Sequence, residues 1–417
     1  MSFPRYERYK DSGVEWLGEV PEHWEVRKLR HAARIENGRD HKEIEVEEGG
    51  YPVFGSGGAF ARASSFLSEK PSVLLGRKGT IDRPLYVDEP FWTVDTSFYT
   101  VVSEDMDAKF LYYQCLGIPF SFYSNGTALP SMTQTTLYEV PSLRPTIIEQ
   151  QRIVLFVDSE TAKIDGLIEE QRRLIELLKE KRQAVISHAI TKGLNPNAPM
   201  KDTGMEVLGK IPSHWNCGPL KHFAKVIDCK HVTVEFVDAG KPIVSIRELK
   251  NDRIELSEAK LASEEEWEFL REGRVPATGD LIICRNASVG AVGEVTSGME
   301  FSMGQDVCLV RPSIPGGFDF FMLISGVVRQ QIDALLVGTT IRRLNVEAIR
   351  GLIVADPPKG ERLKIARYLR SEAKKCDALV SEAVGVIELL QERRSALISA
   401  AVTGKIDVRN YVPKEAA

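Results

Sequence analysis

Two long stretches of this chain repeat apolar residues with the period of an α-helix. Within residues 146–191, a seam of positions seven residues apart consists of Ile164, Gln171, Leu178 and Val185. Within residues 358–403, the corresponding seam consists of Cys376, Ala383, Leu390 and Leu397. No proline interrupts either stretch after its start, and good helix formers fill the other faces. At 1.5 Å per residue each helix would be roughly 65–70 Å long. A helix of that length with a heptad seam needs a partner helix.

Shorter patterns fill residues 25–145 and 216–356. Runs of β-branched and aromatic residues, broken by Gly and Pro, occur at 51–58, 72–80, 98–102, 242–246, 280–288 and 306–310. Such runs predict strands that end in turns, and residues 106–116 and 319–335 are typical of helices. Each region therefore predicts a globular α+β domain with a twisted sheet.

The chain is also an internal repeat. Residues 10–35 recur at 201–226, and residues 145–191 recur at 357–403, both without a gap. A period of this size is that of a domain and excludes a short-repeat solenoid. We expect the two near-duplicate helices to pair with each other as an antiparallel coiled coil, which relates the two α+β domains by a pseudo-two-fold axis. A separate oligomerisation coil for each helix is the alternative.

Composition and charge narrow the class of protein. The 417 residues carry 54 Lys and Arg against 59 Asp and Glu, a net charge of -5. This balance argues mildly against nucleic-acid binding over the whole surface, but it allows a local basic face. No apolar run approaches the roughly 18 residues that span a bilayer, so no membrane contact is expected. The six cysteines lack zinc-site spacing, which predicts buried thiols, a cytoplasmic protein and no metal site.

Patterns that resemble catalytic motifs each lack an essential part. The glycine-rich run 55–60 lacks the GK[ST] ending of a phosphate-binding loop. Residues 356–359, Asp-Pro-Pro-Lys, lack the aromatic residue of amino-methyltransferases and are typical of a helix start. Asp252, Glu258 and Lys260 form a poor nuclease metal set. The sequence therefore predicts no catalytic residue.

The dipeptide His-Trp occurs in both copies of the repeat, at 23–24 and 214–215. Its presence in both copies indicates that the local structure depends on it. We interpret the tryptophan as a packing residue and the histidine as a capping residue, rather than as catalytic groups.

Binding is better supported than catalysis. Residues 77–80, Arg-Lys-Gly-Thr, follow a predicted strand and align with Arg-Asn-Ala-Ser at 285–288. Each turn combines Arg, a second donor, a small residue and a hydroxyl, the types that hold phosphates and contact base edges. A second polar loop near the end of each insert, at 126–134 and 338–345, is equivalent between the copies. A solvated polar turn is the alternative for any one of these loops.

With these motifs the chain resembles the specificity subunit of a type I DNA restriction-modification system. The resemblance covers nearly the whole chain and rests on the 10–26 opening, the YPVFGSGG turn, the RKGT strand end, GTALPSMT before PxxxEQQRI, and IELLKEKRQAVISHAITKGL. One departure is the second helix start, PPKGERLKI, where the first copy has PTIIEQQRI. This difference could alter how tightly the second helix docks a partner.

The resemblance implies target-recognition domains at 1–145 and 196–356, and helical spacers at 146–195 and 357–417. Each domain would read one half of a bipartite, asymmetric site in double-stranded DNA. The helices would set the gap between the halves and dock two modification (methyltransferase) subunits, which recruit restriction/translocase subunits. The family subunit is non-catalytic and binds no cofactor, whereas S-adenosylmethionine, ATP and Mg belong to the partner subunits.

The DNA-facing loops of the family correspond here to 51–58, 77–80, 126–134, 242–247, 285–288 and 338–345. The candidate DNA-binding residues in these loops are Tyr51, Ser56, Arg77, Lys78, Thr80, Thr127, Ser131, Thr133, Gln134, Arg247, Arg285, Asn286, Ser288, Thr339, Thr340, Arg342, Arg343 and Asn345. A coiled-coil adaptor whose two sheet domains bind proteins is the alternative function. A fused nuclease-methyltransferase is a third, but the chain is too short for those domains.

Overall fold

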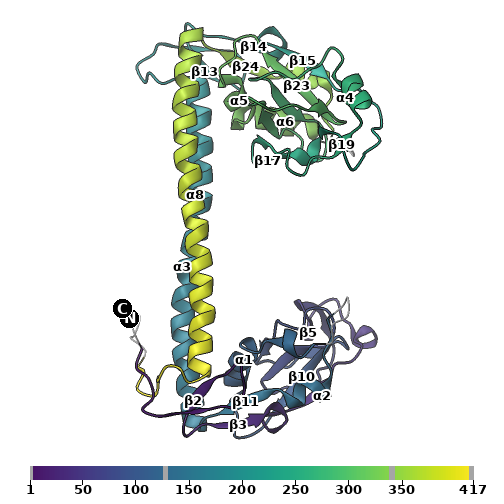
Figure 1. The fold of residues 1–417 in the computed structure, drawn as a ribbon. Coiled ribbons are helices and arrows are strands. Elements are labelled where there is room, and N and C mark those ends of the chain that lie inside the picture. The colour runs from purple at the N-terminus through teal and green to yellow at the C-terminus, as the bar shows by residue number, and fades with distance from the viewer. Residues whose placement is uncertain (1–2, 125–129, 338–342, 413–417) are drawn as a thin grey trace. The chain divides into compact units, whose positions relative to one another are not determined.

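The computed structural model describes residues 3–124, 130–337 and 343–412, and the chain divides into two units (Figure 1). Unit 1 consists of Met1–Gln171 and Val384–Ala417, and unit 2 consists of Arg172–Ala383. Each unit combines one copy of the framework and its insert with part of both long helices. The repeat in the sequence is therefore also a repeat of structure.

Unit 1 contains small sheets and short helices before the first long helix. Its strands are β1 (Tyr9–Asp11), β2 (Glu19–Pro21), β3 (Glu25–Lys28), β4 (Ala33–Asn37), β5 (Tyr51–Gly55), β6 (Gly58–Ala63), β7 (Ser72–Gly76), β8 (Leu85–Val87), β9 (Trp92–Thr93), β10 (Ser97–Val102) and β11 (Pro141–Arg144). Its helices are α1 (Ala108–Leu116), α2 (Gln134–Glu139) and the start of α3 (Ile147–Lys192), with short 3-10 turns η1 (Leu29–His31), η2 (Lys42–Ile44) and η3 (Phe120–Phe122).

Unit 2 repeats this order with additions. Its strands are β12 (Met200–Asp202), β13 (Lys210–Pro212), β14 (Asn216–Pro219), β15 (Ala224–Asp228), β16 (Lys241–Val244), β17 (Leu249–Lys250), β18 (Arg253–Ile254), β19 (Leu261–Ala262), β20 (Leu281–Cys284), β21 (Val292–Glu294), β22 (Ser302–Met303), β23 (Val307–Pro312) and β24 (Ile353–Asp356). Its helices are α4 (Glu264–Arg271), α5 (Phe318–Leu323), α6 (Gly326–Leu336), α7 (Val346–Gly351) and the start of α8 (Lys359–Val402), with η4 (Leu220–His222) and η5 (Ile246–Glu248).

The sheets of the two units match strand for strand. The four-stranded antiparallel sheet has the order β4-β10-β7-β8 in unit 1 and β15-β23-β20-β21 in unit 2. A three-stranded sheet follows in each, β6-β5-β9 and β19-β16-β22, with one antiparallel and one parallel pair. The hairpin β17-β18 and helix α4 are additions of unit 2. The inserts therefore share a scaffold while they differ in sequence.

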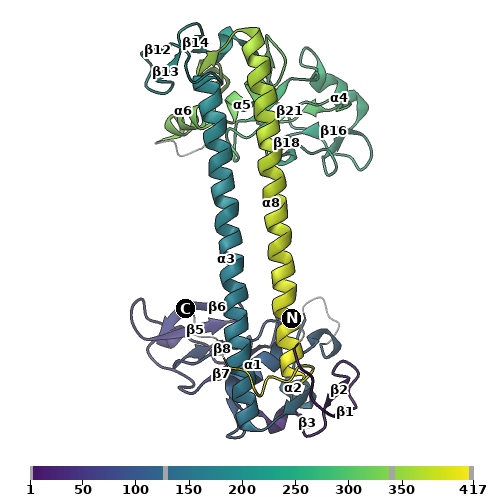
Figure 2. The same ribbon diagram turned by 90° about the vertical axis from the view of Figure 1, so that its left-hand side faces the viewer.

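The long helices pair in antiparallel fashion within each unit. In unit 1 the first half of α3 lies beside the second half of α8, and Asp165 pairs with Arg394 at 2.9 Å (Figure 2). In unit 2 the second half of α3 lies beside the first half of α8, and Arg182 lies 3.8 Å from Asp377. The expected seam is buried or half-buried at every position, with Ile164, Leu178, Cys376, Ala383 and Leu397 buried. The predicted antiparallel coiled coil is therefore confirmed.

A tryptophan and a histidine lock the start of each long helix. In unit 1 the carboxylate of Glu149, in the first turn of α3, accepts from the Trp24 indole N–H at 3.0 Å and contacts His23 Nε2 at 3.0 Å. In unit 2 the carboxylate of Glu361 in α8 accepts from the indole N–H of Trp215 at 2.5 Å. Both indoles are fully buried, so the packing role predicted for tryptophan holds. The sequence alone does not reveal this contact, because the tryptophan and the glutamate lie more than 120 residues apart in the chain.

The C-terminal end of each long helix packs against the same two indole rings. Gly193 and Gly404 end α3 and α8 with φ values of 72° and 71°. A Cβ at Gly404 would lie 2.3 Å from Pro21 and 3.2 Å from the Trp24 ring, and a Cβ at Gly193 would lie 3.1 Å from the Trp215 ring. Both the left-handed backbone and the lack of space require glycine. Each unit thus holds the start of one helix and the end of the other on one buried indole.

Several local predictions need correction or extension. The helix predicted at 319–335 is two helices, α5 and α6. The break falls at Ser325, whose hydroxyl accepts from Val328 N and so caps the start of α6. The strands predicted at 51–58, 72–80, 98–102, 280–288 and 306–310 correspond to β5, β7, β10, β20 and β23. Helix α4 and the small strands β17 and β18 were not predicted. Among the described residues, no helix is long and apolar enough to cross a membrane.

Candidate nucleic-acid interface

The two polar loops predicted in each insert meet in both units. In unit 1 the N–H of Arg77 donates to Thr96 O at 2.9 Å, and Met132 N donates to Arg77 O at 3.0 Å. Lys78 then faces Ser131 across an antiparallel bridge. The strand-end loop after β7 and the loop before α2 therefore form one surface. We call these two loops the paired loops.

Unit 2 builds its paired loops with the same backbone bonds. Arg285 N donates to Asp306 O at 2.8 Å, and Leu344 N donates to Arg285 O at 2.7 Å. Asn286 faces Arg343 across the corresponding bridge. The sequence predicted each loop separately, and the structure brings the members of each pair together.

The arginines that open the two strand-end loops have different surroundings. Arg77 is half-buried: its Nη1 donates to Asp95 O at 3.3 Å and its guanidinium lies 5.8 Å from the centre of the Phe98 ring. Arg285 is 5% exposed, its Nε donates to Leu344 O at 3.1 Å, and its Nη1 pairs with Asp228. A direct DNA contact of the buried Arg285 side chain is not favoured by this geometry. We interpret it as a positioning residue beneath the loop.

Asp306 fastens the remaining side chains of the unit 2 loops. Its carboxylate accepts from Arg343 Nη2 at 2.9 Å and from Asn286 Nδ2 at 3.3 Å. Asp306 has φ 64° and Ala287 has φ 53°, so both adopt the left-handed region that L residues rarely occupy. Backbone strain of this kind clusters where function depends on loop shape. The sequence analysis missed Asp306, although a charged or hydroxyl residue directly before the central strand of each insert was a usable signal.

Three candidates act as structural groups of the short helices. Thr133 caps α2 by accepting from Thr136 N at 3.1 Å, and Asn345 caps α7 by accepting from Ala348 N at 2.6 Å. Gln134 donates from Nε2 to Ile35 O at 2.9 Å and ties α2 to β4. Thr133 and Asn345 are also exposed, so their capping of a helix does not prevent a contact with DNA. The capping roles and the Gln134 hydrogen bond nevertheless account for these residue types without any contact with DNA.

The other candidates divide between the surface and the undescribed segments. Tyr51 opens β5 and packs edge-on against Phe66, and Ser56 lies in the β5–β6 turn. Thr80 is half-buried and its carbonyl oxygen comes within 2.1 Å of where a Gly76 Cβ would stand, so the turn needs glycine there. Arg247 and Ser288 are exposed in unit 2. Thr127, Thr339, Thr340 and Arg342 lie outside the described residues.

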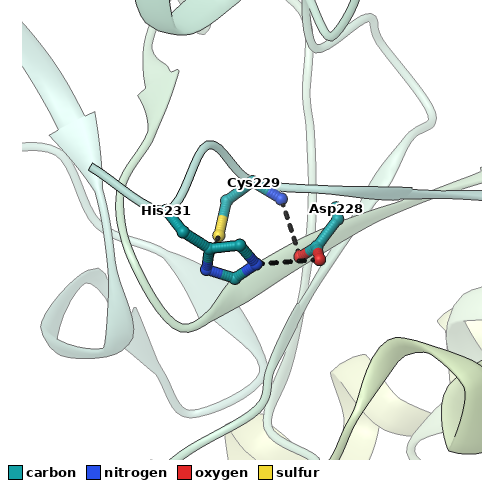
Figure 3. Close-up of side chains that lie close together, drawn as sticks. All are labelled: Asp228, Cys229 and His231. Carbon is teal, nitrogen blue, oxygen red and sulfur yellow. Dashed lines mark hydrogen bonds and ion pairs between the residues drawn. The ribbon is translucent and has the colours of Figure 1, made fainter.

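Asp228 is a second residue that sequence reasoning missed. Its Oδ1 pairs with Arg285 and accepts from Cys229 N, while Oδ2 contacts His231 Nε2 at 3.0 Å (Figure 3). The other ring nitrogen, Nδ1, faces the Cys229 sulfur at 4.0 Å. The imidazole stands between thiol and carboxylate, so the two groups approach different ring nitrogens. One ligand atom from each of the three residues nevertheless lies within 4.8 Å of the others, a spacing that a metal ion can span. Burial raises the pKa of the Cys229 thiol, which disfavours a thiolate ligand.

The residues of the poor nuclease set do not assemble. Asp252 pairs with Arg182 of α3 at 3.2 Å and lines a hollow of about 470 Å³ with Gln183 and Arg329. Glu258 and Lys260 line a different hollow, of about 500 Å³. Asp356 is occupied by an ion pair with Arg362, which agrees with the helix-start interpretation of residues 356–359. The geometry therefore gives no support to catalysis by these groups.

Comparisons with known proteins agree on one family. Residues 21–177 match the family described as type I restriction modification DNA specificity domain. Over 98% of both chains, the sequence is 21% identical to the type I restriction enzyme MjaVIII specificity subunit of Methanocaldococcus jannaschii. Residues 21–177 therefore carry a type I DNA specificity domain, and the chain as a whole resembles a type I specificity subunit. Specificity subunits of this family are non-catalytic.

Solved structures share the fold of this chain. A structure titled as the basis of complex assembly and conformational transition of the type I R-M system covers 92% of this chain and 98% of its own, with a TM-score of 0.68 and 15% identity. The match to the HsdS subunit of Thermoanaerobacter tengcongensis covers 93% of this chain and 98% of that subunit, with a TM-score of 0.48 and 15% identity. The first of these matches spans both copies of the repeat, so the fold shared with that structure extends beyond the residues of the family match.

Proposed function

We propose that this chain is the DNA-binding subunit of a type I restriction-modification complex, in which each unit reads one half of a bipartite, asymmetric site. The observation that carries the proposal is the presence of equivalent paired loops in two units whose inserts differ in sequence. A shared scaffold with different loops is what two different half-sites require. The resemblance to type I specificity subunits supports double-stranded DNA as the ligand.

Within the paired loops, the donors at the bridged positions are the candidates for direct contact: Lys78 and Arg343 are exposed, and Ser131 and Asn286 are half-buried. Lys78 and Ser131 in unit 1 correspond to Asn286 and Arg343 in unit 2. Arg77 remains half-exposed beside its loop, whereas Arg285 holds its loop from below. Amide and guanidinium groups contact base edges, whereas a lysine or a hydroxyl serves phosphates equally well. We infer that unit 2 depends more on side-chain readout at this surface.

The long helices supply the docking surface in this proposal. Their pairing leaves Leu167 and Leu389 exposed in unit 1, and the repeat-equivalent Leu379 and Leu177 exposed in unit 2. Their exposed fractions run from 46% to 65%. Because each unit exposes the same pair of positions, two copies of one partner fit them. We infer that these partners are two methyltransferase subunits, which in turn recruit restriction/translocase subunits.

The chemistry of the complex then belongs to the partners. S-adenosylmethionine, ATP and Mg would be bound by the modification and restriction subunits, and adenine methylation and DNA cleavage would occur there. The complex would act in the cytoplasm, where chromosomal and invading DNA meet it. The acidic net charge is compatible with this arrangement, since the partners share the DNA contacts.

The experiment is a selection of bound sequences from random double-stranded DNA, with the full chain and its modification subunit. We expect enrichment of two short motifs separated by a gap of fixed length. The adaptor alternative expects no enriched motif, and a single unsplit motif would contradict the two-unit reading. A matched sample without this chain controls for DNA binding by the modification subunit alone.

A further inference from the structure

A surface hollow of unit 2 joins two of the candidate DNA-binding loops. It has a volume of about 500 Å³ and is lined by Arg247, Lys250, Glu255, Glu258, Lys260 and Ser288, among others. Arg247 belongs to the loop after β16, and Ser288 belongs to the paired loops. The side chains of these six residues are exposed. The hollow therefore continues the surface that the paired loops form.

Two of the three carboxylates that line the hollow, those of Glu255 and Glu258, accept no hydrogen bond from the described part of the chain. Lys250 Nζ lies 3.7 Å from Glu255 Oε2 and 3.7 Å from Glu258 Oε2, which is beyond hydrogen-bond distance. By contrast, the nearby Glu248 accepts from Ser245 N and Oγ at 2.7 Å and is buried. Glu255 and Glu258 thus share an ion pair with Lys250 but keep oxygen atoms available to accept hydrogen bonds, and Arg247 makes no ion pair with any described residue.

Carboxylates on a DNA-binding face are informative because they repel phosphates. They gain free energy there when they accept hydrogen bonds from base donors, and in the major groove Glu and Asp accept from the N4 amino group of cytosine. The N6 amino group of adenine is flanked by the N7 acceptor, which a carboxylate disfavours. Arg and Lys donate to O6 and N7 of guanine, on the same base pair as cytosine. A hollow with both kinds of group suits a C·G pair.

We propose that this hollow reads a C·G base pair in the half-site of unit 2, with Glu255 or Glu258 accepting from cytosine N4 and Arg247 donating to guanine. The inference rests on the proposed function and names the base that this surface selects. Unit 1 has no equivalent, because its β5 and β6 are joined by the short turn at Ser56, where unit 2 inserts η5, β17 and β18. The tight β17–β18 turn, with Asn251 and Asp252 at φ 50° and 60°, fixes the position of Lys250.

The test compares Glu255→Gln, Glu258→Gln and the double variant with wild type in the random-DNA selection. Glutamine keeps the size of the side chain but replaces one acceptor oxygen by a donor. Glu265→Gln on α4 is the matched control, because Glu265 is exposed, loses the same charge and lies outside the hollow. We expect one of the single variants, or the double variant, to lose about 5- to 150-fold in preference for C·G at one position of the unit 2 half-site. The unit 1 half-site and the control should keep wild-type preferences.

Two results would overturn the inference while they leave the proposed function intact. One is a wild-type split motif whose unit 2 half contains no C·G pair. The other is a set of variants that bind every sequence more tightly by the same factor, as expected if the carboxylates merely repel phosphates. A wild-type chain that enriches no split motif at all would instead contradict the proposed function itself.

Discussion

The two units hold the same paired loops with different chemistry. Unit 1 relies on backbone bonds and leaves Arg77 half-exposed, whereas unit 2 buries Arg285 against Asp228 and ties Asn286 and Arg343 to Asp306. The backbone bonds between the loops are nevertheless equivalent. The comparison shows that the scaffold depends on backbone geometry, so that side chains at the loops are free to diverge.

The starts of the long helices differ in the same way. In unit 1 the buried Gln150 of α3 accepts from Asp107 N and donates to Asp105 O and Pro145 O. In unit 2 the equivalent residue of α8 is Arg362, which pairs with Asp319 and Asp356. A neutral amide in one copy is thus replaced by a buried ion-pair network in the other. Buried ion pairs are costly to break because one charge is left unpaired.

The largest expected effect follows from this network. Arg362→Gln, which introduces the unit 1 residue, should lower the free energy of unfolding of unit 2 by roughly 3–5 kcal/mol, since Asp319 is 1% exposed and loses its cationic partner. Adding Asp319→Asn should recover much of the loss. Urea unfolding followed by circular dichroism measures both. Lys375→Gln, at an exposed pair with Glu372, is the control and should leave the unfolding curve nearly unchanged.

The loop arginines come next. Arg285→Ala should cost roughly 2–3 kcal/mol of stability through the loss of charged hydrogen bonds, and should weaken DNA binding by releasing the loop. Arg77→Ala should cost less than about 1 kcal/mol and weaken DNA binding directly. Unfolding curves and filter binding on the same samples separate the two effects. Equal stability losses in both variants would contradict the contrast between a buried, loop-holding Arg285 and a half-exposed Arg77.

The smallest expected effect concerns the helices as a spacer. Arg182 of α3 lies beside Asp377 of α8, so four helix-forming residues inserted after Glu180 and four after Asp377 keep the pair in register. The insertion adds about 6 Å at 1.5 Å per residue. Since DNA rises about 3.4 Å per base pair, the gap should lengthen by one or two base pairs.

Four residues also rotate a helix by roughly 40° beyond one turn, which local unwinding can absorb as a stutter. Both half-site sequences should persist, because no loop is changed. Mapping of methylated adenines in cells that carry the insertion measures the gap. Insertion in α3 alone is the control and should impair activity by shearing the pair.

Much of this architecture is readable from the sequence because the repeat and the heptad seams report local, periodic burial. The strands that carry Arg77 and Arg285 follow from the same kind of pattern. The contacts of Asp228 with Arg285 and of Glu149 with Trp24 were not predictable, since each joins residues far apart in the chain and no periodicity marks them. The burial of Arg285 was missed for that reason, as its partner lies 57 residues away.

The most direct test of the account is an exchange of the first insert. Residues 25–145 are replaced by the corresponding insert of another specificity subunit, and the DNA site is determined by methylated-adenine mapping. The account predicts that the half-site of unit 1 changes to that of the donor, while the half-site of unit 2 and the gap stay the same. A change in both half-sites, or in neither, would contradict independent recognition by the two units.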